Sequence, residues 1–98
     1  MANKKDLNFE TKVIHAGQKS DPTTGAVMTP IVLASTFEQS SPGVHKGYDY
    51  SRSINPTREA FENCIASLEN GVKGYGFSSG VAAISACIEL LSPGDHVI

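Results

Sequence analysis

The second half of the chain carries the pattern that most restricts its fold. Asn55 is a favoured helix N-cap, and Pro56 suits the first helical position because its missing N–H would be unpaired there in any case. Apolar residues then recur at every third or fourth position until Asn70-Gly71, a typical helix stop. This pattern predicts a helix over residues 56–69.

Alternating elements continue beyond this helix. The segment "VKGYGF", residues 72–77, is short, aromatic and punctuated by glycine, which is typical of a buried strand where another group comes close to the backbone. A second helix is opened by "SSG" and stops before Pro93-Gly94, after which "DHVI" predicts another strand. The order helix, strand, helix, strand predicts an α/β fold in which helices cover a parallel sheet. Because the last strand starts at the final residues, we expect an N-terminal fragment of a longer fold.

The first half of the chain lacks such a period. Residues 1–10 are polar and predict a loose terminus, and residues 11–41 are irregular and rich in Thr, Ser, Gly and Pro. We therefore expect an N-terminal arm over residues 1–55 and the opening of a packed domain over residues 56–98.

The composition excludes several classes of protein. With 98 residues, 40% of them hydrophobic and 18% charged, the chain is predicted to be a globular domain, or part of one, with a thin core. A formal net charge of −2 and scattered lysines and arginines provide no basic stripe for nucleic acid. No apolar run is long enough for a membrane span and no secretory signal is visible, so we expect a cytoplasmic protein.

The cysteines and histidines give no sign of a disulfide framework or a metal site. Cys64 and Cys87 both fall in apolar helical patterns, which predicts buried free thiols. His15, His45 and His96 lack the close spacing of metal ligands, and we predict no metal.

The turn before the second helix, "GFSSGVAA", is the most informative place for chemistry. The exposed N–H groups of a helix's first turn, together with the helix dipole, form an anion site. Ser78 and Ser79 can add hydroxyl donors, and Gly80 lets the backbone approach a phosphate oxygen. The dipole contributes only about 0.3 to 1 kcal/mol, so a cation is also needed to hold an anionic cofactor.

Arg52 is the candidate for that cation. Guanidinium offers a planar fork to phosphate, and a hydrogen bond to a charged group contributes about 1.5 to 3 kcal/mol. In an extended segment residues i and i+2 project to one side, so Tyr50 and Arg52 are predicted to point at the same ligand. The alternative is that Arg52 is a solvated surface charge and "SSG" an ordinary helix cap. Beside them, we expect Tyr48 to pack and Asp49 to form a turn or interface hydrogen bond.

Five motifs, in order, resemble those of a known family. "TKVIHAGQ", "TPIVLASTF", "YDYSRSINPTR", "FSSGVAAI" and "LLSPGDHVI" are similar to the N-terminal part of the pyridoxal-phosphate-dependent Cys/Met metabolism enzymes. This group includes cystathionine γ-synthase, cystathionine γ-lyase, cystathionine β-lyase and methionine γ-lyase. The resemblance covers residues 11–98. It implies the PLP-dependent transferase fold (aspartate aminotransferase-like, fold type I), with the arm 1–55 contacting a neighbouring subunit and residues 56–98 starting the domain that binds pyridoxal 5'-phosphate (PLP).

The resemblance also implies which residues bind the cofactor phosphate. Tyr50 and Arg52 match the Tyr and Arg that reach across a subunit interface to the phosphate of the neighbouring protomer. Gly80 and Val81 match positions that bind the phosphate of their own subunit through backbone N–H groups, beside the hydroxyl of Ser79. Val81 replaces a common Met or Leu, and we expect this to be harmless for a backbone contact.

A second departure from the family pattern, at Ile54, and one absence have consequences. Ile54 stands where the family often has Gly, so the turn after Arg52 must tolerate a β-branched residue, which disfavours positive φ. The family's Schiff-base lysine and the aromatic residue that stacks on the cofactor belong to segments beyond Ile98. We therefore expect no catalytic residue within this chain and no activity from it alone, with Lys46 and Lys73 solvated.

The implied reaction is elimination or replacement at the γ or β carbon of a sulfur amino acid. The implied assembly is a homotetramer built from dimers that share active sites. The forms of "YDYSRSINPTR" and "SPGVHKGY" favour cystathionine γ-lyase or γ-synthase, acting on cystathionine or an O-acylhomoserine, over cystathionine β-lyase and methionine γ-lyase.

Two other functions stay open on the residues alone. Gly74, Gly76 and Gly80 partly match the dinucleotide-binding fingerprint, but one spacer is too long and two of the glycines lie inside the predicted strand. The alternative of another class is a non-catalytic oligomerisation fragment. The PLP-dependent enzyme and the oligomerisation fragment can be told apart by one observation, because a mere assembly module would hold no PLP in the full-length protein.

Overall fold

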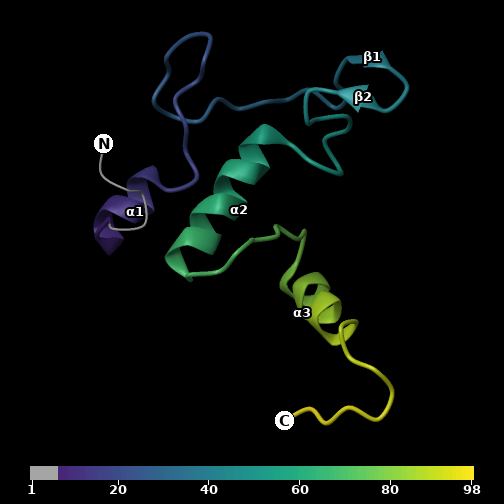
Figure 1. Cartoon of the computed structure of the whole chain (residues 1–98). Helices are drawn as coiled ribbons and strands as arrows, with labels where there is room; N and C mark the ends of the chain where they lie inside the picture. The colour runs from purple at the N-terminus through teal and green to yellow at the C-terminus, as the bar shows by residue number, and fades with distance from the viewer. Residues whose placement is uncertain (1–6) are drawn as a thin grey trace.

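The computed structural model describes residues 7–98. Its helices are joined by long loops, and a short antiparallel hairpin projects from the arm (Figure 1). In chain order, the elements are α1 (Phe9–His15), β1 (Gln39–Ser41), β2 (Val44–His45), α2 (Pro56–Leu68) and α3 (Gly80–Ile88).

The arrangement of these elements is open. The radius of gyration is 16.8 Å, whereas that of a compact chain of about 100 residues is about 13 Å. Among the described apolar residues only Ala16 and Ala66 are buried, and large side chains such as Ile84 are exposed, here at 62%. The described residues therefore do not form a globular unit by themselves. In place of the thin core expected from the composition, only these two alanines are buried, near the contact between α1 and α2.

The start of α2 is capped as predicted, and it also holds the arm. The Asn55 side chain accepts a hydrogen bond from the Thr57 N–H at 2.9 Å, and Pro56 occupies the first turn. The Asn55 amide nitrogen donates to the Val32 carbonyl oxygen at 3.1 Å, and the Thr57 hydroxyl donates to the Pro30 carbonyl oxygen at 3.0 Å. The arm is thus docked on the helix that follows it.

The end of α2 also agrees with its sequence signals. Asn70 takes the left-handed conformation with φ 55°, and the Gly71 N–H bonds the Ala66 carbonyl oxygen at 2.8 Å. This geometry closes a helix by satisfying one of its last carbonyl groups. α2 ends at Leu68, one residue before the predicted boundary.

Neither predicted strand forms. Residues 72–77 and 95–98 lie in loops without ladder hydrogen bonds. A strand is stable only beside another strand, and among the described residues no segment offers its backbone to either stretch. The expected parallel sheet is therefore absent from residues 7–98. The close approach expected at a glycine does occur, because a Cβ on Gly74 would lie 3.2 Å from the Glu62 carbonyl carbon.

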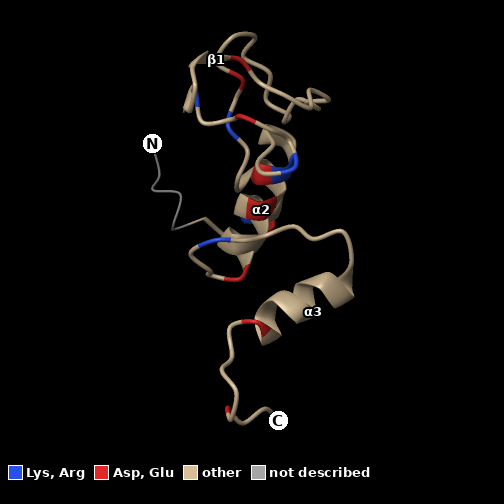
Figure 2. Cartoon of the chain, turned by 90° about the vertical axis from the view of Figure 1, so that its right-hand side faces the viewer, with Lys and Arg blue, Asp and Glu red and all other residues tan. Residues whose placement is uncertain are grey.

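Helix α3 (Gly80–Ile88) is opened by "SSG", as predicted, with Ser79 as its N-cap, but it ends earlier than its sequence suggests. The hydrogen bonds from the Leu90 N–H to the Cys87 oxygen at 3.2 Å and from the Leu91 N–H to the Ile88 oxygen at 3.0 Å form turns beyond the helix. Within its bounds α3 carries no charged residue, whereas α2 carries both signs of charge (Figure 2). Its apolar face has no covering neighbour among the described residues.

Three elements, α1, β1 and β2, lie where the sequence predicted none. α1 spans the end of the expected loose terminus, residues 1–10, and the start of the irregular segment that follows, and it packs on α2. Gly17 permits this approach, since it has φ 74° and a Cβ there would lie 2.6 Å from the Cys64 backbone nitrogen. The hairpin of β1 and β2 turns at Pro42-Gly43, where Gly43 has φ 78°.

The cysteines are free, as expected, but neither is buried. Cys64 is half-buried and Cys87 is exposed on α3. The prediction of buried thiols is wrong because the helix pattern placed Cys87 on an apolar face that nothing in the described structure covers. Between residues 7 and 98, no helix has the length and apolar character needed to cross a membrane, and no three His, Cys, Asp or Glu side chains group as metal ligands.

Candidate functional site

The turn after Tyr50 positions the two phosphate-binding candidates of the arm. Tyr50 pairs with Thr36 in an isolated antiparallel bridge. Its carbonyl oxygen accepts hydrogen bonds from the N–H groups of Ser53 and Ile54, both at 3.0 Å. The chain therefore reverses immediately after Tyr50, and Arg52 lies in the turn.

Tyr50 and Arg52 contact each other directly. Arg52 Nη2 donates a hydrogen bond to Tyr50 Oη at 2.8 Å, and the guanidinium carbon lies 5.4 Å from the ring centre, within cation–π range. The two side chains therefore lie together, while their pointing at one ligand stays a prediction. The alternation of an extended segment is the wrong explanation for this contact, because a turn brings the two side chains together.

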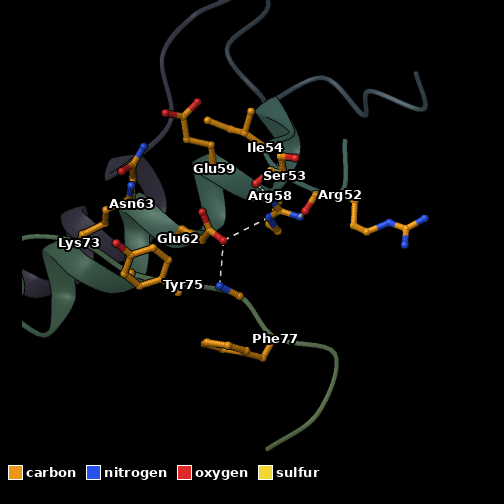
Figure 3. A pocket seen from close by; sticks show the side chains of 12 residues that line it. Arg52, Ser53, Ile54, Arg58, Glu59, Glu62, Asn63, Lys73, Tyr75 and Phe77 are labelled. Carbon is orange, nitrogen blue, oxygen red and sulfur yellow. Dashed lines mark hydrogen bonds and ion pairs between the residues drawn. The ribbon is translucent and has the colours of Figure 1, made fainter. Parts of the chain in front are cut away.

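The charge of Arg52 is not compensated within the described structure. The guanidinium is exposed and has no carboxylate partner among residues 7–98. Figure 3 shows the Arg52 side chain extending away from the other labelled side chains. A guanidinium in this state can offer its remaining N–H groups to an anion.

Ile54 fits the turn without strain. Asn70 is the one non-glycine residue with positive φ among those described, so the backbone at Ile54 lies in an ordinary region. The replacement of a glycine at this position therefore does not disturb the turn that carries Arg52.

Arg58 holds the carbonyl groups of this turn. Its Nη1 donates to the carbonyl oxygens of Ser51 and Arg52 at 3.2 and 3.3 Å, and its Nη2 donates to that of Ser53 at 2.6 Å. Three successive carbonyls are thus bound by one side chain. Reasoning from the sequence missed this role, because the spacing from Arg52 to Arg58 does not reveal that the turn folds back onto α2.

Glu62 continues this network. Arg58 Nε lies 3.2 Å from Glu62 Oε1, within ion-pair distance but without the alignment of a hydrogen bond. The same carboxylate oxygen accepts a hydrogen bond from the Gly76 N–H at 2.8 Å, as Figure 3 shows. These groups line a cavity of about 250 Å³ between α2, the turn and the segment 73–77. The i,i+4 spacing of Arg58 and Glu62 was a sequence signal for the ion pair alone.

The start of α3 forms the second half of the candidate site. Ser79 is its N-cap, and Ser79 Oγ accepts a hydrogen bond from the Ala82 N–H at 3.2 Å. The N–H groups of Gly80 and Val81 have no hydrogen-bond partner among residues 7–98. A Cβ on Gly80 would meet no atom within 4 Å, so the space in front of the helix is open. Two backbone donors and the Ser79 hydroxyl can therefore receive a phosphate group.

The structure does not bring the two halves of the site together within one chain. The cavity that Arg52 lines extends to Phe77 but does not include Ser79, Gly80 or Val81. No hydrogen bond joins these three residues to Tyr50 or Arg52 within the described part of the chain.

Tyr48 and Asp49 act as expected beside the site. The Tyr48 ring lies 5.5 Å from that of Phe37, and Tyr48 Oη donates to Glu59 Oε2 at 2.6 Å. This hydrogen bond, with burial and the negative charge of Glu59, raises the pKa of Tyr48 to about 12. Asp49 Oδ1 accepts from the Tyr50 N–H at 2.7 Å. The predicted packing of Tyr48 and the turn hydrogen bond of Asp49 are confirmed.

Comparison with solved structures gives the class of protein. The chain superposes on the crystal structure of cystathionine γ-lyase from Lactobacillus plantarum complexed with L-serine, with a TM-score of 0.81 and 51% identity. The match covers 92% of this chain and 23% of the other. The fold is the α/β fold of PLP-dependent transferases, which confirms the fold class expected from the sequence.

The family follows from the sequence match. Residues 10–98 match the profile of the family described as Cys/Met metabolism PLP-dependent enzyme, and the chain belongs to this family. Its cofactor is PLP, as expected. The open space at Gly80, the two unpaired N–H groups and the uncompensated Arg52 fit the phosphate of that cofactor.

Curated relatives share much of this sequence. The chain is 62% identical over 96 residues to cystathionine β-lyase of Coxiella burnetii, which covers 98% of this chain and 25% of that protein. It is 52% identical over 99 residues to cystathionine γ-lyase of Dictyostelium discoideum, covering 100% of this chain and 26% of that protein. The chain thus spans about a quarter of the length of these relatives.

Proposed function

We propose that this chain supplies phosphate-binding residues to two different active sites of a PLP-dependent enzyme of sulfur amino-acid metabolism. Tyr50 and Arg52 bind the cofactor phosphate of a neighbouring protomer, and Ser79, Gly80 and Val81 bind that of their own. The observation that carries this proposal is the exposed guanidinium of Arg52, which is paired with a neutral hydroxyl and, among residues 7–98, with no carboxylate.

The residues of the chain act on the phosphate and not on the reacting atoms. The Arg52 guanidinium neutralises part of the phosphate charge, while the Tyr50 hydroxyl orients that guanidinium and can donate its own proton to a phosphate oxygen. The N–H groups of Gly80 and Val81 fix the remaining oxygens at the positive end of α3. When bound, PLP acts as an electron sink for negative charge developed at the substrate α carbon.

The reaction that we propose is γ-elimination or γ-replacement on cystathionine or an O-acylhomoserine. Cystathionine β-lyase or methionine γ-lyase chemistry is the second candidate, and it gains weight from the relative of Coxiella burnetii named cystathionine β-lyase. Family membership argues against a dinucleotide site and against a non-catalytic assembly module.

The wider organisation of the protein is part of the same proposal. Residues 1–55 serve as the arm that contacts the neighbouring subunit, and residues 56–98 open the PLP-binding domain. The assembly is a homotetramer made of dimers that share active sites, in the cytoplasm. The Schiff-base lysine is supplied by a segment beyond Ile98, so the chain of 98 residues catalyses nothing alone.

The test uses the full-length protein and measures retained PLP by absorbance after dialysis. Arg52→Ala should lose most of its cofactor, whereas Lys19→Ala, which removes the same charge at an exposed residue of the arm, should keep it. Equal retention in the two variants would remove the basis of the proposal.

A mixing experiment tests the shared sites. The Arg52→Ala variant and a variant of the Schiff-base lysine should each be inactive, and refolding them together should restore activity in hybrid dimers. Hybrids that stay inactive, although they assemble, would contradict phosphate binding across the interface.

A further inference from the structure

We propose that Arg58 is a positioning residue for the cofactor phosphate, acting through the turn that carries Arg52. This inference rests on the proposed phosphate contact of Arg52. Arg58 is not itself one of the proposed phosphate-binding residues. Its three hydrogen bonds to protein carbonyls and its ion pair with Glu62 already occupy the guanidinium.

The turn has a specific need for a cation at this point. The carbonyl oxygens of residues 51–53 all face the Arg58 guanidinium, at 2.6 to 3.3 Å. Without that side chain, these carbonyl oxygens would need water or a different backbone conformation to satisfy them. One of them belongs to Arg52, so any change in the turn alters where the Arg52 side chain begins.

Glu62 extends the effect to the segment before α3. It pairs with Arg58 and accepts the Gly76 N–H, and its side chain is only 14% exposed. The backbone of Glu62 also lies so close to Gly74 that no Cβ would fit there. The pair Arg58–Glu62 therefore ties the arm turn and the segment leading to Ser79 to the same two turns of α2.

A lysine replaces Arg58 in this role only in part. The planar fork presents donors in several fixed directions, which lets one group bind three carbonyls and a carboxylate together. An ammonium is a compact charge with three donors and cannot span the same acceptors. Arg58→Lys is therefore a variant that keeps the charge and loses the geometry.

The experiment compares two ligands of the full-length apoenzyme: PLP, and pyridoxal, which lacks the phosphate. The dissociation constant for PLP should rise about tenfold in Arg58→Ala, because this variant loses the charge-assisted hydrogen bonds that hold the turn. A smaller rise should appear in Arg58→Lys and in Glu62→Gln. The affinity for pyridoxal should stay unchanged in all three variants. Lys73→Ala is the matched control, because Lys73 lines the same cavity but bonds no carbonyl of the turn.

Each outcome decides between separate claims. If Arg52→Ala weakens PLP binding but Arg58→Ala does not, Arg58 has no positioning role and the proposed function stands. Equal loss of PLP and pyridoxal affinity in Arg58→Ala would mean a general structural role and would overturn the inference. If Arg52→Ala itself binds PLP normally, the proposed function fails. Should Arg58→Ala not fold, the ratio of the two ligand affinities in Arg58→Lys decides the question in the same way.

Discussion

The Arg52 guanidinium donates a hydrogen bond of 2.8 Å to the hydroxyl of Tyr50, two residues earlier in the chain. The same cation lies 5.4 Å from the centre of the Tyr50 ring. The tyrosine thereby restricts the directions in which an exposed arginine can point. A long side chain that is already oriented loses less conformational freedom when it binds an anion.

Removal of the Tyr50 hydroxyl should weaken cofactor binding in the full-length protein. Tyr50→Phe keeps the ring beneath Arg52 but loses the hydrogen bond, which at this exposed position is worth about 1 kcal/mol, or about fivefold in the dissociation constant for PLP. Titration of the apoenzyme with PLP measures this change. Tyr75→Phe is the control, since the exposed Tyr75 hydroxyl has no hydrogen-bond partner among residues 7–98. The same affinity in both variants would mean that Tyr50 does not orient Arg52.

The hydrogen bond between Tyr48 and Glu59 should make stability depend on alkaline pH. The folded-state pKa of Tyr48 is raised to about 12 from an ordinary value of 10.0, so the protonated phenol is favoured by folding. Its contribution is fully present below pH 10 and is lost as the pH rises from about 10 to about 12. Urea unfolding of the full-length protein at several pH values should show a steeper loss of the free energy of unfolding in the wild type than in Tyr48→Phe across this window. Parallel curves for the two proteins would argue against the hydrogen bond.

The Asn55 cap should matter more than its position at a helix end suggests. Asn55→Ala removes the bond to the Thr57 N–H and the two bonds that its amide nitrogen donates to Val32 and Ser51. The loss should lower the free energy of unfolding by about 2 to 3 kcal/mol. Asn63→Ala, at an exposed residue of the same helix, should change it by less than about 0.5 kcal/mol. Urea denaturation of both variants checks the difference, and a similar effect of the two would show that the arm is not held by Asn55.

Two glycines with nearly the same backbone angle should respond differently to substitution. Gly17 has φ 74° and Gly25 has φ 73°, so alanine at either position costs about 1 to 2 kcal/mol for the left-handed conformation. A Cβ at Gly17 would also collide with the backbone of Ala60 and Cys64, whereas at Gly25 it would meet nothing within 4 Å. The free energy of unfolding of Gly17→Ala should therefore fall by roughly a further 2 kcal/mol. Equal destabilisation would mean that α1 does not pack on α2 through Gly17.

Sequence signals located the local features of the site. The cap at Asn55, the stop at Asn70-Gly71 and the N-cap at Ser79 all depend on short-range hydrogen bonds, so neighbouring residues were enough to identify them. The spacing of Tyr50 and Arg52 suggested that the two side chains lie together, but for the wrong reason, because a turn and not an extended segment brings them into contact. The prediction of a strand at 72–77 was wrong, because a strand forms only beside a partner strand and a local sequence pattern does not reveal that partner.

The roles of Arg58 and Gly17 could not be predicted in the same way. Arg58 binds carbonyls that lie five to seven residues away across a turn, and Gly17 meets α2 more than forty residues further along the chain. The Arg58 side chain, and the absence of a side chain at Gly17, make these contacts possible only once the arm has folded back on α2. A motif comparison identifies such residues as part of a pattern, but it does not show the contacts that explain their roles.

By itself, the sequence determined the ends of α2, the start of α3 and the family to which the chain belongs, since these depend on neighbouring residues and on the order of motifs. Tertiary structure alone decided that a turn pairs Tyr50 with Arg52, that Arg58 holds this turn, and that the helix start at Gly80 lies outside the Arg52 cavity. The physical reason is that carbonyls, carboxylates and free N–H groups act over a few ångströms of space, and the path of the chain determines which of them meet.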